Sequence, residues 1–270
     1  MAGRGRPWSV STARRADELL AGLHRPTLGG APRAVDLDAV ARELRVRVRQ
    51  APASQAWRGL TRWEEGLPVV YLREELASES RLRFTFAHEL GHVLVERARV
   101  HGSTLPAGGW DLERLCDAVA GAMLLPTDDM RVLARRDALS IGDFQAMARA
   151  YRVTLSAVAV RLRRVGRPVR MWRFLTPAFG RPRGVVGMRR DQLDELRVGL
   201  ESQAQLSALP VDREVPIEFS ARCAESAVDH EIVGSGYRSS RQVTILIARQ
   251  DGRHLAWSTD FCSHSRRTAP

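Results

Sequence analysis

The sequence predicts an α+β protein: a mainly helical part with a small sheet, followed by a smaller α+β part. Apolar residues recur at helical spacing through much of residues 35–165, and short β-type runs interrupt this pattern between residues 45 and 72. After residue 188, one helix-like segment precedes several strand-like runs. With 270 residues that are 44% hydrophobic, the chain can bury one large core or two to three small ones.

The net charge of +11 arises from 42 Lys and Arg against 31 Asp and Glu, and every cation is Arg. Asn is also absent, so a G/C-rich genome explains the bias towards Arg. The basic balance favours acidic or polyanionic partners, and DNA contact is one possibility it leaves open.

The remaining composition points to the cytoplasm. Three scattered cysteines do not make a disulfide framework. No apolar run approaches the roughly 20 residues of a membrane-spanning helix. The basic start, Met1–Pro7, lacks the apolar stretch of a signal peptide.

The elements expected before residue 80 are short. Residues 1–33 are basic, with Gly and Pro at both ends, and are expected to form a leader with one helix near Ala13–Leu23. Asp36 is placed to cap an amphipathic helix over 35–44. Two strands are predicted, one from the Arg/Val alternation of 45–49 and one from LPVVYL at 67–72.

Helices are predicted through the middle of the chain. An apolar helix is expected to start near Phe84, and a second helix, Leu112–Leu125, is ended by Pro126. Three short helices are expected over 128–166.

The last third has a mixed pattern. A Pro-, Gly- and Arg-rich stretch over 166–187 predicts a linker. Beyond it we expect a helix and three strands, the last two joined by a hairpin turn at Asp251-Gly252: helix 191–205 and strands 215–221, 242–248 and 254–259.

The clearest chemical signal is His88-Glu89-Leu90-Gly91-His92, an H-E-x-x-H motif within the apolar helix. Residues four apart on a helix lie one above the other, so His88 and His92 can present two imidazoles to one zinc ion. Both fall on the side of the helix opposite its buried stripe and face a cleft. The competing interpretation is a helix without a metal, in which the His and Glu side chains only hydrogen-bond to each other.

A catalytic zinc ion needs a third protein ligand and an open fourth position. Glu113 is the preferred third ligand, 21 residues after His92 on the second helix. Asp117, one turn later, is placed to orient a ligating His. The rival third ligands, in order, are Asp111, Asp117 and His101.

With zinc bound, Glu89 would serve as the general base for amide hydrolysis. Zinc activates a water molecule and polarises the carbonyl under attack, while the neighbouring carboxylate takes the proton. Glu89 also argues against a purely structural zinc site, which has no use for a base beside an open position.

These residues resemble the ImmA/IrrE family of metallopeptidases. The resemblance covers about residues 35–165 and rests on RFTFAHELGH at 83–92, the E-x-x-C-D-x-V-A run from Glu113, and the L-L-P at 124–126. The chain departs from the family pattern at three positions: Cys116 for Ala, Asp117 for Asn and Val119 for Phe.

The resemblance implies zinc held by His88, His92 and Glu113, with Glu89 catalytic. It also implies a cytoplasmic, gluzincin-like metalloendopeptidase that cleaves a helix-turn-helix (XRE-type) repressor and derepresses a stress or mobile-element regulon. The expected layout comprises five parts: leader 1–33, zincin-like domain 34–127, helix-turn-helix-like segment 128–168, linker 169–187, and a C-terminal α+β domain 188–270 with a sensor or regulatory role as the expectation.

The helix-turn-helix-like segment leaves a second function class open. Within 144–164, Val153 is expected to close a turn and Thr154 to cap the second helix, although Arg152 stands where Gly is commoner. Three arginines on that helix could contact phosphate, namely Arg161, Arg163 and Arg164. The alternatives are a DNA- or protein-binding regulator with a structural or inactive zinc site, and a hairpin that only packs against the peptidase or grips its substrate.

Overall fold

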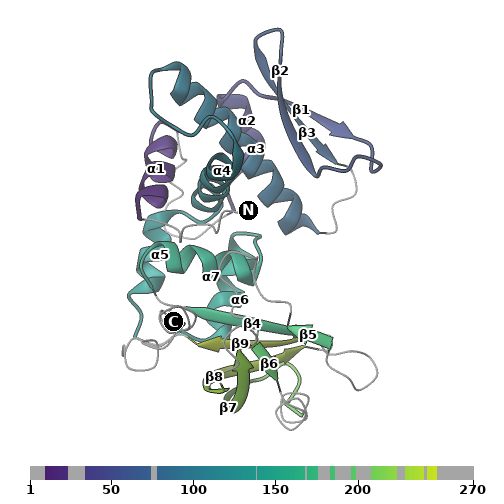
Figure 1. Cartoon of the computed structure of the whole chain (residues 1–270), viewed down its shortest axis with the longest axis vertical. Helices are drawn as coiled ribbons and strands as arrows, with labels where there is room; N and C mark the ends of the chain where they lie inside the picture. Colours follow the sequence, from purple (N-terminus) through teal and green to yellow (C-terminus); the bar gives the residue numbers. More distant parts are fainter. Residues whose placement is uncertain are drawn as a thin grey trace, which may run out of the picture. The chain divides into compact units, whose positions relative to one another are not determined.

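The computed structural model of the chain is α+β, as predicted (Figure 1). It describes most of the first two thirds of the chain and parts of the last third: residues 10–23, 34–73, 78–137, 139–167, 169–175, 183–185, 196–198, 208–223, 229–239 and 242–247. The chain divides into two compact units, one of residues 8–134 and 146–165 and one of residues 1–7, 135–145 and 166–270.

The first unit is mainly helical. Its helices are α1 (Val10–Leu20), α2 (Leu37–Glu43), α3 (Glu79–Val100), α4 (Gly109–Leu124), α5 (Thr127–Ala134) and α7 (Leu155–Arg164). Helix α6 (Ile141–Ala150) runs from the second unit into the first. The three short helices predicted over 128–166 are therefore confirmed. No helix among the described residues has the length and apolar character needed to cross a membrane.

The local signals for helix ends are borne out. The Asp36 side chain accepts a hydrogen bond from the Ala39 N–H at 3.0 Å, and Thr154 accepts one from Ala157 at 3.1 Å. Arg152 adopts the left-handed conformation, with φ of 54°, so the turn before α7 forms without glycine. Helix α3 begins at Glu79, five residues before the expected start, so the polar residues before Phe84 form its first turn.

The small sheet of this unit has three strands in the order β1-β3-β2. The predicted strands are β1 (Arg47–Ala51), parallel to the central strand, and β3 (Leu67–Arg73). Strand β2 (Gly59–Glu64), which was not predicted, pairs antiparallel with β3 through a Glu65-Gly66 turn in which both φ angles are positive. Strand β2 is an edge of this sheet.

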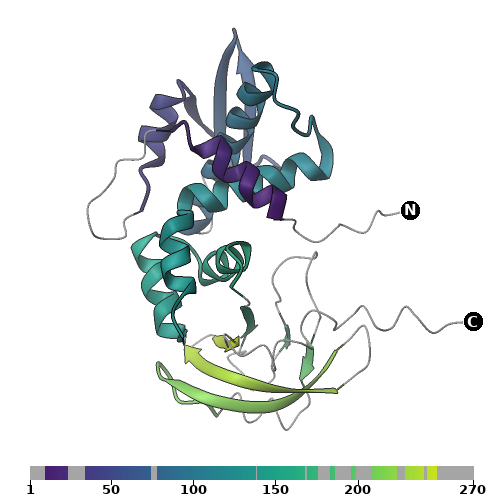
Figure 2. The same cartoon turned by 90° about the vertical axis from the view of Figure 1, so that its left-hand side faces the viewer.

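The core of the unit lies where α3 packs on α4, with α1 against α4 and the sheet against α3 (Figure 2). Leu90 and Val93 of α3 are fully buried, as are Ala118 and Val119 of α4. Gly91 allows a close helix crossing, because a Cβ atom there would lie 3.3 Å from the Cys116 Cα. The two helices that carry the predicted ligands are thus held together by a dry interface.

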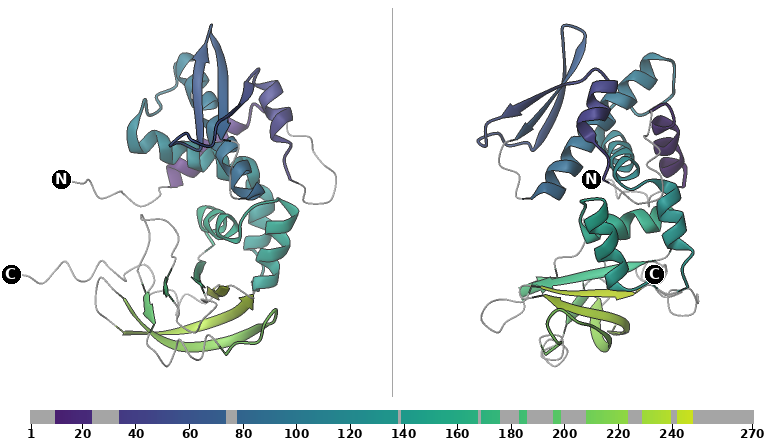
Figure 3. Two further views of the ribbon diagram at one scale, coloured as in Figure 1. Left: turned by 90° about the vertical axis from the view of Figure 1, so that its right-hand side faces the viewer. Right: turned by 180° about the vertical axis from the view of Figure 1, so that it is seen from behind.

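The second unit contains a six-stranded sheet in the order β5-β4-β9-β8-β7-β6, with every neighbouring pair for which a register is described running antiparallel (Figure 3). Its strands are β4 (Arg170–Leu175), β5 (Arg183–Val185), β6 (Leu196–Val198), β7 (Glu214–Cys223), β8 (Asp229–Ser239) and β9 (Gln242–Ile247). The strands predicted at 215–221 and 242–248 are confirmed as β7 and β9.

Other predictions for this part differ from the structure. Residues 169–187, expected as a linker, contain β4 and β5. Within the helix expected over 191–205, Leu196–Val198 is a strand paired with β7, because sheet pairing outweighs local helix propensity. The rest of that helix, the strand at 254–259 and the Asp251-Gly252 turn lie outside the described residues.

Candidate metal centre and active site

Helix α3 places His88 and His92 one turn apart on the same face. Their Nε2 atoms lie 3.2 Å from each other. Helix α4 brings Glu113 to the same point, with its Oε2 3.2 Å from His88 Nε2 and its Oε1 3.6 Å from His92 Nε2. The structure therefore brings together the three residues expected to bind metal, and it is the helix crossing at Gly91 that makes this possible.

Asp117 lies one turn after Glu113 on α4 and contacts the other side of the His88 ring. Its Oδ1 is 3.0 Å from His88 Nδ1. When that nitrogen donates to the carboxylate, Nε2 is the ring atom that faces Glu113 and His92. This is the orienting contact that the sequence predicted for Asp117. The two other rivals, Asp111 and His101, are both exposed, and neither joins this cluster.

The donor set fits a zinc ion. Two imidazole nitrogens and a carboxylate oxygen are ordinary zinc ligands, and bonds of 2.0–2.1 Å in a tetrahedron separate neighbouring donors by about 3.3 Å. The two Nε2 atoms lie 3.2 Å apart, and each lies 3.2 to 3.6 Å from one of the two Glu113 carboxylate oxygens, which is close to that edge length. Among the described residues, this is the one group of three His, Cys, Asp or Glu side chains spaced to hold a metal ion.

The two histidines differ in their electrostatics. Burial lowers the pKa of His88, but the hydrogen bond and charge of Asp117, with Glu89 and Glu113 nearby, more than offset burial and raise it above its ordinary value. Burial and the neighbouring His88 lower the pKa of His92. Without a metal, the carboxylates favour a proton on His88, which a cation at the same point would replace.

Glu89 lies beside this cluster and is buried, with 7% of its surface exposed. Burial is the main cause that raises its pKa, while the Thr61 hydrogen bond and His88 act in the opposite direction. The Thr61 hydroxyl lies 2.7 Å from Glu89 Oε2 and 3.1 Å from the Glu89 carbonyl oxygen. Glu89 is thus a carboxylate of fixed orientation and raised basicity.

Strand β2 contributes two residues that sequence analysis missed, Thr61 and Gly59. A Cβ atom at Gly59 would lie 2.6 Å from Glu89 Oε1 and 2.7 Å from Thr85 Cγ2, so any side chain there would displace the carboxylate. The signal that could have revealed β2 is Glu65-Gly66, a two-residue hairpin turn directly before the predicted strand at 67–72.

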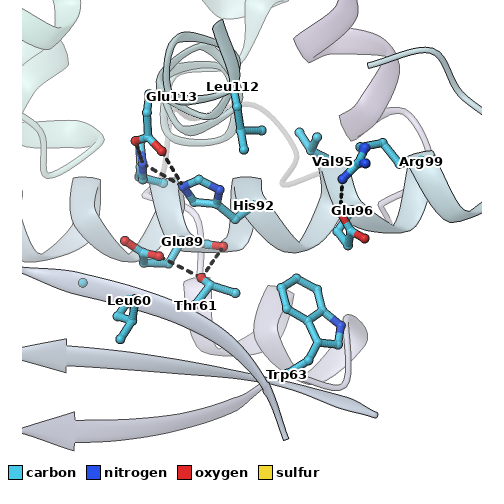
Figure 4. A pocket seen from close by; sticks show the side chains of 12 residues that line it. Leu60, Thr61, Trp63, Glu89, His92, Val95, Glu96, Arg99, Leu112 and Glu113 are labelled. Carbon is cyan, nitrogen blue, oxygen red and sulfur yellow. Dashed lines mark hydrogen bonds and ion pairs between the residues drawn. The ribbon is translucent and has the colours of Figure 1, made fainter. Parts of the chain in front are cut away.

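These residues line a groove of about 350 Å³ whose floor is α3 and whose walls are β2 and α4 (Figure 4). Glu89, His92 and Glu113 lie at one end of the groove, which His88 also lines. The Glu113 side chain is 52% exposed, so the metal-binding cluster opens to the groove. The arrangement can place a substrate beside both the cluster and Glu89.

The part of the chain that carries this site is similar to a known protein family. Residues 41–163 match the family model described as the IrrE N-terminal-like domain, peptidase M78. The matched range includes β2, α3 and α4, which supply every residue of the site. No curated protein gives a significant match. Among solved structures, a Mycobacterium tuberculosis transcriptional regulator is similar, at 15% identity over 96% of this chain and 79% of that one, with a TM-score of 0.41.

Proposed function

We propose that this chain is a zinc-dependent metalloendopeptidase, a proposal supported by the match of residues 41–163 to the IrrE N-terminal-like family model of M78 peptidases. The observation that carries the proposal is a cluster of three metal-ligand side chains beside an oriented, buried glutamate in an open groove. A structural zinc site would need a fourth protein ligand and no base.

His88, His92 and Glu113 would hold the ion, with Asp117 fixing the His88 ring. When bound, zinc supplies Lewis-acid chemistry that makes water nucleophilic at neutral pH. Glu89 accepts the proton of the attacking water and delivers it to the nitrogen of the departing amine. The Thr61 hydroxyl holds one carboxylate oxygen, which leaves Oε1, beside Gly59, to handle the proton.

Strand β2 offers the peptide its binding edge. Its inner edge pairs with β3, and its residues Gly59, Leu60, Thr61 and Trp63 line the groove. An extended peptide can add to such an edge through main-chain hydrogen bonds, which hold the scissile bond at a fixed height above α3. A substrate segment must therefore be extended or locally unfolded to be cut.

The substrate is proposed to be a regulatory protein, a helix-turn-helix repressor of the XRE type, whose cleavage derepresses a stress or mobile-element regulon in the cytoplasm. This part of the proposal is supported by the family resemblance of the motifs around His88 and Glu113. The rival regulator hypothesis relies on the arginines of α7. Arg161 is only 2% exposed and is hydrogen-bonded to Leu125 and Asp17, so it cannot contact phosphate.

The test is a census of new protein N-termini in host cells that express the wild type or Glu89→Gln at equal levels, with and without DNA damage. A cut within a repressor that requires Glu89 supports the proposal. Absence of any Glu89-dependent cut in every condition contradicts it. Salt-sensitive duplex binding by the full chain, equal in both proteins, would then favour the DNA-binding regulator.

A further inference from the structure

The groove continues past the metal cluster along α3. Beyond His92, its lining includes Val95, Glu96 and Arg99 on the floor, Trp63 from β2 and Leu112 from α4. At a rise of 1.5 Å per residue, this floor extends about 10 Å beyond His92. That length equals about three residues of an extended peptide. The mechanism proposed above uses none of these side chains.

The chemistry of this end is apolar. Val95 is buried and forms part of the floor, with Leu112 on one wall and Trp63 on the other (Figure 4). The charged groups here neutralise each other, since Arg99 donates to Glu96 with 2.6 Å between Nη1 and Oε2. A paired Glu and Arg at the rim leaves no single charge for a ligand to match, so an apolar side chain is the best fit.

Trp63 is 44% exposed, although it is a large aromatic residue within a strand. It follows Gly59 and Thr61 at the two-residue period of a strand, so the three share the face of β2 that meets α3. The same strand face thus borders Glu89 through Gly59 and Thr61, and the apolar end through Trp63.

Strand polarity fixes which part of the substrate reaches Trp63. A peptide that adds antiparallel to β2, the commoner and slightly more stable pairing, runs from Glu64 towards Gly59. Its residues before the scissile bond then lie beside Trp63, and those after it lie beside Gly59. Thr61, the neighbour of Glu89, is two strand positions from Trp63, or about 7 Å.

We infer that Trp63, Val95 and Leu112 form a specificity subsite for a large apolar side chain one or two residues before the scissile bond. The inference rests on the proposed function and deepens it by assigning the sequence preference. Trp63 is its main determinant, because it is the largest of the three and 44% of its surface is exposed.

The test measures binding of acetyl-dipeptide hydroxamates to zinc-loaded Glu89→Gln protein, so no turnover is needed. The probes carry Phe, Leu or Ala at the first or second residue before the hydroxamate, and glycine at the other. We expect Phe to bind about 10-fold tighter than Ala at one of these positions. In the Trp63→Ala background, that preference should fall to about 3-fold or less.

Trp110→Ala is the matched control. Trp110 is 59% exposed at the start of α4 and does not line the groove, so its removal should leave the Phe preference unchanged. Equal binding of the Phe and Ala probes at both positions overturns the subsite. So does a preference that survives in Trp63→Ala, provided that the zinc content of the two proteins is the same.

Failure of the peptidase proposal gives a different result. If the probes discriminate through Trp63 but wild-type protein cuts no peptide, the subsite stands and the hydrolytic function is wrong. If Glu89-dependent cleavage occurs with no apolar preference before the cut, the function stands and the subsite is wrong. Protein that retains neither zinc nor probes would contradict both.

Discussion

The groove and helix α7 are two polar regions of one unit that use charge in opposite ways. In the groove, His88, Glu89 and Glu113 face an open cleft. On α7, Arg161 is buried: its Nε donates to the Leu125 carbonyl at 2.9 Å, and its guanidinium contacts Asp17 and Thr127. Arg164 donates to the Asp117 carbonyl at 3.0 Å. The groove is arranged for a ligand, whereas these arginines join α7 to α1 and α4.

Basic residues on a helix therefore do not by themselves mark a phosphate-binding face. Their position in the packed structure decides what they contact. Arg161 contacts two segments that are far apart in the sequence, at Asp17 and at Leu125–Thr127, and Arg164 contacts the carbonyl of Asp117, the residue that orients His88. Helix α7 therefore packs against α4, the helix that carries Glu113 and Asp117.

The largest expected effect comes from Glu89→Gln. Loss of the base should reduce kcat/KM for peptide cleavage by about 10³-fold or more, while zinc content stays equal to wild type. Metal analysis and cleavage assays on the same preparation check both parts. An active, zinc-loaded variant would assign the base to another residue.

The two carboxylates of α4 should differ in metal binding. Glu113→Ala removes a ligand and should weaken zinc binding by well over 100-fold, whereas Asp117→Ala removes the contact that orients His88 and should weaken it by about 10- to 100-fold. Competition against a zinc chelator measures both affinities. Equal losses, or none for Glu113→Ala, would reverse the assignment of ligand and orienting residue.

Arg161→Ala tests the structural role of α7. Removing a buried cation leaves the Leu125 carbonyl and Asp17 without this partner, so the free energy of unfolding should fall by about 3 kcal/mol. Arg149→Ala, which alters an exposed arginine of α6, should change it by less than about 0.5 kcal/mol. Urea unfolding measures both changes in the free energy of unfolding. Similar changes for the two variants would contradict the structural role of Arg161.

The smallest effect is expected at Thr61. Thr61→Val keeps the shape but removes the hydroxyl that stabilises the ionised Glu89, so the pKa of this base should rise. Because Glu89 works in its deprotonated form, the acid limb of the pH–rate profile should move to higher pH. The maximal kcat should fall only about 10-fold. If the acid limb of the pH–rate profile stays at the same pH, Thr61 does not stabilise the ionised carboxylate of Glu89.

Much of the region around the metal-ligand cluster could be predicted from the sequence because its signals are local. The H-E-x-x-H spacing, the cap at Asp36 and the stop at Pro126 each act within a few residues. Glu113 could be nominated because it shares a helix face with Asp117. Residues Gly59, Thr61 and Trp63 could not be nominated from the sequence. Their strand is defined by the turn at Glu65-Gly66, and its place beside the cluster depends on packing against α3.

The second unit was harder to predict for the same physical reason. Its strands are defined by partners distant in sequence: β4 pairs with β9, and β6 pairs with β7. Arg- and Pro-rich residues near 170–187 look like a linker until those partners are known. On α7, the N-cap at Thr154 was foreseeable, but the burial of Arg161 depended on Asp17, 144 positions earlier.

The central claim is that the groove between α3, α4 and β2 is a zinc peptidase active site. Its most direct test incubates purified full-length protein of measured zinc content with unfolded host proteins and identifies the new N-termini. We expect cuts that disappear with Glu89→Gln or a zinc chelator and return when zinc is restored. Zinc-loaded wild-type protein that produces no such cuts would contradict it.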